Sequence, residues 1–173
     1  MQLGVADSKA FGSGPRAKAR RSALAEEVNR VAVWTATRVA TPEVIDARVA
    51  RGELNALERE LAVSMLESAP LDSSDTIICD GTRLFSPLER HFSGLQALDK
   101  AESKSTSVAA ASILAKVLRD AAFEQIAGRY EASYGPLKGG GYPNAATTAF
   151  LDWHVATFGE LPPETRKSWG RRA

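Results

Sequence analysis

The longest helical pattern in the sequence runs from Ser107 to about Tyr134, and it limits what this chain can fold into. The segment is dense in Ala, Leu, Ile and Val. Its most apolar positions lie largely on one side of a helix, where they can pack on a sheet. Three consecutive alanines, 109–111, would let that helix approach another backbone closely. We therefore expect one long helix that packs against other secondary structure.

Shorter helices and strands are expected around this helix. Helical patterns cover Pro15 to about Asn29, Pro42 to about Ala50, Asn55 to Ser68, and Asn144 to about Phe158. Thr41 before Pro42 is typical of a helix start, and Asn144 can cap the last helix. Strand patterns cover residues 30–39, 76–79 and 94–98. Helices that alternate with at least two strands predict an α/β or α+β fold.

Composition narrows the class of protein. The chain has 173 residues, 44% of them hydrophobic and 25% charged, which predicts one globular domain over residues 1–173. No apolar run approaches the roughly 18 residues that a membrane span needs, and no signal peptide is evident. Cys79 is the single cysteine, so an internal disulfide is excluded and a cytoplasmic location is expected. The net charge of +1 does not by itself indicate nucleic-acid binding.

One candidate functional residue is Asp80, which closes the β-branched run before Gly81. Side chains at the carboxyl end of a buried strand often point into a crevice, which suits an active-site acid. The same Asp-Gly pair is also a common turn signal, and the dipeptide alone favours the turn.

A polar stripe forms a second candidate. Ser112, Lys116 and Asp120 are spaced four residues apart, so they stack along one face of the expected helix. The stripe fits a functional edge of a core helix. It fits equally a solvated face with a Lys–Asp pair worth a few tenths of a kcal/mol.

Five motifs in order resemble the ribonuclease HII family. The longest match covers residues 100–103 and 108–120, including Ala-Ala-Ala-Ser-Ile-Leu-Ala-Lys and Arg-Asp. The other matches are Ala6-Asp7-Ser8-Lys9, Ile78-Cys79-Asp80-Gly81, Gly141-Tyr142-Pro143 and Arg166-Lys167-Ser168-Trp169. The resemblance spans nearly the whole chain, and its strength lies in the ordered set of motifs.

The resemblance implies a fold, an activity and a site. It implies a ribonuclease H-like α/β fold with a C-terminal helical extension. It also implies a hydrolase that cuts RNA in RNA–DNA hybrids, or at ribonucleotides embedded in duplex DNA, with Mg²⁺ or Mn²⁺. Asp80 and Asp120 would be catalytic metal ligands that face a shared cation site, and Tyr142 would meet the sugar at the RNA–DNA junction. Lys9, Ser112 and Lys116 are further candidates for phosphate contact or for support of the site. We expect a monomer.

The sequence departs from the family's pattern at its start. The family begins with a strand that bears Asp-Glu and a Gly-Arg-Gly turn, whereas this chain starts six residues before its Asp-Ser-Lys motif. We therefore expect an incomplete sheet without the first two strands, weak metal binding and little cleavage by these 173 residues. An incomplete product is favoured over a degenerate relative because the later motifs are intact. The alternative function is a non-catalytic remnant that binds nucleic acid.

Overall fold

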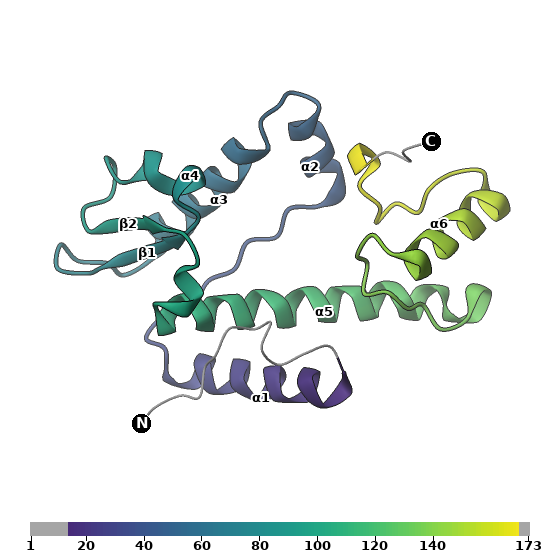
Figure 1. The fold of residues 1–173 in the computed structure, drawn as a ribbon, viewed down its shortest axis with the longest axis horizontal. Coiled ribbons are helices and arrows are strands. Elements are labelled where there is room, and N and C mark those ends of the chain that lie inside the picture. Colours follow the sequence, from purple (N-terminus) through teal and green to yellow (C-terminus); the bar gives the residue numbers. More distant parts are fainter. Residues whose placement is uncertain (1–13, 170–173) are drawn as a thin grey trace. The chain divides into compact units, whose positions relative to one another are not determined.

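The computed structural model describes residues 14–169, which fall into two compact units whose elements are labelled in Figure 1. Within the described residues, the first unit comprises 14–38 and 55–117, and the second comprises 39–54 and 118–169. Each unit is described by itself, and the single domain over residues 1–173 stays a prediction. No helix among the described residues is both long and apolar enough to cross a membrane.

A small parallel sheet organises the first unit. Strands β1 (Ile77–Asp80) and β2 (Leu95–Leu98) pair in parallel, with Ile77 opposite Leu95 and Asp80 opposite Leu98. The connection between them contains helix α4 (Thr82–Phe85) and the 3-10 helix η2 (Ser86–Leu88). Figure 1 shows α4 next to the two strands, and the contacts of α4 with both strands agree. Both strands, 76–79 and 94–98 in the sequence, are confirmed, and the α/β fold class is confirmed with them.

Two helices of the first unit were predicted from their apolar spacing. Helix α1 (Pro15–Val31) begins with a proline at its first position, which costs nothing there because the first amides of a helix lack internal partners. Its buried residues, Arg21, Ala25 and Val28, recur at helical spacing. Helix α3 (Leu54–Ser68) buries Leu57.

The strand predicted over residues 30–39 is wrong. Helix α1 continues through Val31, and residues 32–40 form no strand. The alternating Val and Thr pattern is real, but the side chain of Val33 is 98% exposed and Val39 is also exposed. A strand exists only when its backbone pairs with a neighbour, and β1 and β2 pair only with each other among the described strands.

Capped helices organise the second unit. Helix α2 (Pro42–Val49) starts where predicted, with the Thr41 hydroxyl accepting from the amide of Val44 at 3.5 Å. Helix α6 (Ala145–Phe158) is capped by Asn144, whose Oδ1 accepts from the amide of Thr147 at 3.1 Å. The long helix α5 (Thr106–Tyr134) is confirmed over its whole predicted length, and its residues from 118 onward belong to this unit.

An aromatic cluster packs α5 against α6. The rings of Tyr130 and Phe150 lie 4.9 Å apart, centre to centre, and those of Tyr134 and Trp153 also 4.9 Å. His154 is buried in the same cluster, with Nδ1 2.7 Å from the carbonyl oxygen of Glu160. The cluster fixes α6, and with it the glycine-rich loop that precedes this helix.

Candidate active site

The acid at the end of β1 is held by the loop that follows β2. Oδ1 of Asp80 accepts a hydrogen bond from the amide of Ala101 at 2.8 Å. Oδ2 of Asp80 has no hydrogen-bond partner within residues 14–169. Asp80 is exposed, so its second oxygen can bind a ligand from solvent. The local geometry therefore suits the role expected for this acid.

A second acid, Asp99, reinforces this strand end, and sequence reasoning did not single it out. Oδ1 of Asp99 accepts from the amide of Thr82 at 2.8 Å, while Lys104 Nζ donates to the Asp99 carbonyl oxygen at 3.1 Å. Each acid thus caps the loop that follows the other strand. The signal that could have found Asp99 was its place directly after the second strand, since parallel strands end at one edge of a sheet.

The other expected metal ligand, Asp120, lies on α5 in the second unit. Its side chain is 19% exposed, and Oδ1 is 3.7 Å from Nη1 of the neighbouring Arg119. Ser112 and Lys116 precede it on the same continuous helix, both half-buried. The helix carries the polar stripe as predicted, and the functional role of the stripe stays a prediction.

Tyr142 is presented by a loop of three glycines. Its side chain is 49% exposed. The guanidinium carbon of Arg119 lies 3.8 Å from the centre of its ring. Arg119 Nη2 also donates to the carbonyl oxygen of Gly140 at 2.6 Å. The guanidinium of Arg119 therefore stacks on the ring, while about half of the side chain stays exposed.

The loop conformation requires glycine. Gly139, Gly140 and Gly141 all have positive φ, at 91°, 60° and 70°. A Cβ on Gly139 would lie 2.6 Å from Oδ1 of Asn144, so a larger residue clashes as well as being strained. The side-chain Nδ2 of Asn144 donates to the Gly139 carbonyl oxygen at 2.9 Å, so the residue that caps α6 also holds the loop.

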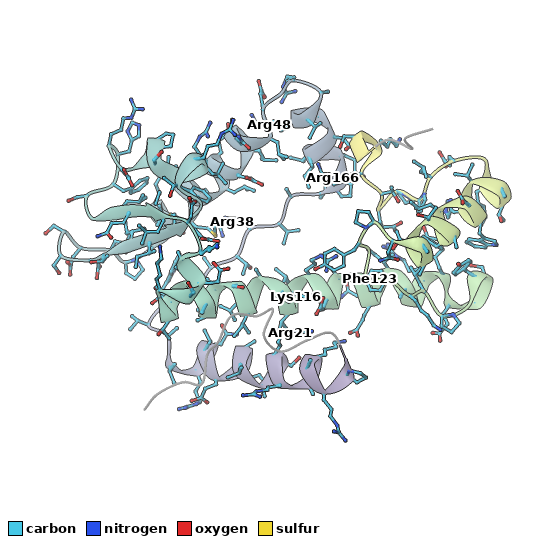
Figure 2. The ribbon with its side chains drawn as sticks, in the orientation of Figure 1. Arg21, Arg38, Arg48, Lys116, Phe123 and Arg166 are labelled. Atoms are coloured by element: carbon cyan, nitrogen blue, oxygen red, sulfur yellow. The ribbon has the colours of Figure 1, made fainter. Side chains whose placement is uncertain are left out.

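An apolar cavity of about 190 Å³ lies beneath this loop in the second unit. Its lining includes Phe123, Phe150, Gly141 and Pro162. Figure 2 labels Phe123, and a Cβ on Gly141 would meet that ring at 3.3 Å. The cavity therefore shares a wall with the segment that presents Tyr142.

The C-terminal motif is anchored by Asp46 of α2. Its carboxylate accepts from the amide of Lys167 at 2.7 Å and from the amide of Ser168 at 2.9 Å. These amides belong to the 3-10 helix η4 (Lys167–Trp169). Hydrogen bonding to Ser168 holds the pKa of Asp46 below its usual value. This anchor joins segments far apart in sequence, and no sequence pattern indicated it.

The donor chemistry of the expected site suits a hard divalent cation. Carboxylate oxygens are the ligands that Mg²⁺ and Mn²⁺ prefer, and Mg²⁺ often binds one or two carboxylates with water and substrate phosphates. Asp80 and Asp120 supply such oxygens, each within its own unit. Across residues 14–169, no three His, Cys, Asp or Glu side chains gather closely enough to hold a metal. Lys9 lies outside the described residues.

Two solved structures share this fold. The chain superposes on the ribonuclease H2 from Pyrococcus horikoshii with a TM-score of 0.77 and 26% identity, covering 97% of this chain and 78% of that one. It superposes on the ribonuclease HII in a PCNA complex from Archaeoglobus fulgidus with a TM-score of 0.74 and 27% identity. The match covers 99% of this chain and 80% of that one. Fold and likeness together define an α/β endoribonuclease of the ribonuclease H type.

Sequence comparison gives the particular family. A family model described as Ribonuclease HII matches residues 1–172. The chain is 32% identical to the Ribonuclease HII of Pyrococcus abyssi, over 97% of this chain and 73% of the relative. It is 36% identical to the Ribonuclease HII of Pyrobaculum neutrophilum, over 97% of this chain and 79% of that relative. The chain belongs to the ribonuclease HII family, and the resemblance found in its motifs is confirmed.

Proposed function

We propose that this protein hydrolyses phosphodiester bonds of RNA in RNA–DNA hybrids and at single ribonucleotides embedded in duplex DNA. The observation that carries the proposal is the contact chain from Asp120 through Arg119 to Tyr142. It joins a candidate metal ligand to a candidate substrate-reading ring within one unit. Membership of a ribonuclease family supports the reaction class.

We assign the metal-binding role to Asp80 and Asp120. A bound Mg²⁺ or Mn²⁺ supplies the activation of a water and the stabilisation of the leaving oxygen. The chain's own contribution at Asp80 is orientation, because the Ala101 amide holds Oδ1 while the residue is exposed. At Asp120 the chain contributes placement, because the side chain lies on helix α5 with Oδ1 3.7 Å from Nη1 of Arg119.

Tyr142 reads the sugar in this proposal. Arg119 stacks on the ring, and about half of the side chain is exposed, so a substrate can approach it from solvent. A nucleotide sugar that abuts this side chain is distinguished by its 2′-hydroxyl, the group that separates RNA from DNA. Lys9, Ser112 and Lys116 contribute phosphate contacts or support the site, and phosphate contacts make binding salt-dependent.

We expect the 173-residue chain to act weakly, as a cytoplasmic monomer. We expect Asp80 and Asp120 alone to give a low affinity for the cation. Low cation affinity limits the rate because the developing charge on the phosphodiester is then less stabilised.

A cleavage assay tests this function. The substrate is a DNA duplex that contains one ribonucleotide, and the cation is Mn²⁺ or Mg²⁺. We expect slow, cation-dependent cutting at the ribonucleotide, lost in Asp80→Asn and Asp120→Asn. Glu131→Gln, an exposed acid on the same helix as Asp120, is the matched control and keeps the wild-type rate.

Two outcomes would contradict the proposal. Vigorous cutting by the 173-residue chain would show that two matched carboxylates are not limiting. Hybrid binding without any cutting, unchanged by Asp80→Asn or Asp120→Asn, would favour the non-catalytic nucleic-acid-binding alternative.

A further inference from the structure

Arg119 makes three contacts within the second unit that together suggest a role of its own. Its guanidinium carbon lies 3.8 Å from the centre of the Tyr142 ring, and Nη2 donates to the Gly140 carbonyl oxygen at 2.6 Å. Nη1 lies 3.7 Å from Oδ1 of Asp120, has no hydrogen-bond partner within residues 14–169, and is buried. The side chain as a whole is 38% exposed. One residue therefore touches both the tyrosine loop and a candidate metal ligand.

The loop needs such a contact to hold a single conformation. Three consecutive glycines have a large conformational freedom, and ordering them costs more backbone entropy than ordering other residues. Asn144 holds the first glycine, Gly139, through its carbonyl oxygen. Arg119 holds the next carbonyl oxygen and the ring itself.

The chemistry of arginine suits this double contact. A guanidinium is planar, so it can stack on an aromatic face and donate hydrogen bonds from its edge at the same time. A lysine carries its charge at one point and cannot meet the ring and the carbonyl oxygen in this way.

We propose that Arg119 is a positioning residue that sets the orientation of Tyr142 and so determines the preference for ribonucleotides. The proposal rests on the proposed function, in which Tyr142 reads the sugar. Arg119 acts through the ring and the loop and need not touch the substrate. Its loss therefore weakens discrimination between RNA and DNA more than it weakens binding to duplexes in general.

Fluorine NMR on protein labelled with fluorotyrosine tests the positioning directly. The Tyr142 resonance is assigned by its disappearance in Tyr142→Phe. We expect Arg119→Lys to shift this resonance because the stacked plane is lost while the charge is kept. Arg129→Lys is the matched control: Arg129 also lies on α5 in the same unit, but it pairs with Glu164 at 2.6 Å. It should leave the Tyr142 resonance in place.

Binding without added metal tests the consequence. The probes are a duplex with one ribonucleotide and the matching all-DNA duplex, each titrated in EDTA. We expect Arg119→Lys to reduce the ratio of the two affinities by about fivefold, the size of a partly exposed cation–π contact. Arg119→Lys in a Tyr142→Ala background should have no further effect on this ratio, because the ring through which Arg119 acts is absent.

The outcomes distinguish failure of the positioning role of Arg119 from failure of the proposed function. An unmoved Tyr142 resonance in Arg119→Lys, with the ribonucleotide preference retained, would overturn the positioning role and leave the proposed function standing. A wild-type protein with no ribonucleotide preference would overturn the proposed function and the discriminating role together, even if the resonance moves. Additive effects of Arg119→Lys and Tyr142→Ala would also overturn the positioning role.

Discussion

The hydroxyl of Tyr130 donates a hydrogen bond to Oε2 of Glu164 over 3.0 Å, which ties α5 to the segment that follows α6. Nη2 of Arg129 lies 2.6 Å from the other carboxylate oxygen, so both oxygens of Glu164 are engaged. Burial, with help from this hydrogen bond, raises the pKa of Tyr130 above its usual value. Glu164 also lines the cavity beneath the tyrosine loop.

Tyr130→Phe should lower the stability of the protein by about 1 kcal/mol, because Glu164 loses a hydrogen bond in a partly buried place. The measurement is a denaturant titration of the free energy of unfolding. Tyr134→Phe is the matched control, since Tyr134 belongs to the same aromatic cluster and its hydroxyl has no hydrogen bond among the described residues. Equal losses in the two variants would contradict the role of the Tyr130 hydroxyl.

Gly139→Ala should destabilise the tyrosine loop more than Gly135→Ala does. The two glycines have nearly the same φ, 91° and 92°, so the backbone strain is matched at about 1–2 kcal/mol. Only Gly139 is crowded, with its Cβ position 2.6 Å from Oδ1 of Asn144, whereas nothing lies within 4 Å at Gly135. Thermal unfolding compares the variants. Indistinguishable midpoints would show that the crowding around Gly139 is relieved without cost.

Gly128→Ala should stabilise the protein by about 0.5–1 kcal/mol. Gly128 lies inside α5, and a Cβ there would meet nothing within 4 Å. Alanine reduces the entropy of the unfolded chain and has a higher helix propensity. Gly159→Ala is the contrasting control, because Gly159 ends α6 with a φ of 80° and should lose stability. A lower unfolding midpoint for Gly128→Ala would contradict the described helix at this position.

The anchor between Asp46 and η4 should be sensitive to acid. The pKa of Asp46 is lower in the folded protein than in the unfolded chain, chiefly because of hydrogen bonding from Ser168. The stabilisation is therefore present above the unfolded value of about 4 and is lost as pH falls through the folded pKa. We expect the stability difference between wild type and Asp46→Asn to shrink as pH falls below about 4. A difference that stays constant with pH would contradict this interpretation.

Local signals in the sequence predicted most of the helices. Thr41 before Pro42 and Asn144 before Ala145 both mark helix starts, and both caps form as expected. A cap hydrogen bond spans only a few residues, so the sequence around it contains the whole interaction. The same reasoning holds for α5, whose apolar pattern extends over many turns.

The wrong strand shows where local signals are not sufficient. Residues 30–39 alternate in the way that a half-buried strand does, yet α1 extends through Val31 and the next residues pair with nothing in the described part of the chain. Strand formation depends on a partner that is distant in sequence. Alternation alone cannot supply that partner.

The candidate site also contains residues that local motifs predicted and contacts that they did not. Asp80 and Asp120 were predicted from their motifs, and each lies on the expected element. The capping by Asp99 and the stacking of Arg119 on Tyr142 were not predicted, because each depends on a loop that returns to a distant element. Adjacency to Asp120 was the available signal for Arg119, but it did not indicate an aromatic partner.

The central proposal is that Asp80 and Asp120 each act as a ligand of a divalent cation. The most direct measurement is a titration of Mn²⁺ binding by electron paramagnetic resonance in the wild type and in Asp80→Asn, Asp120→Asn and Asp99→Asn. We predict that Asp80→Asn and Asp120→Asn each weaken Mn²⁺ binding by at least about tenfold, since each removes one anionic ligand. In Asp99→Asn the side-chain carbonyl oxygen can still accept the hydrogen bond from the Thr82 amide. This variant should therefore bind Mn²⁺ with the wild-type affinity. Unchanged Mn²⁺ affinity in either Asp80→Asn or Asp120→Asn would contradict the account.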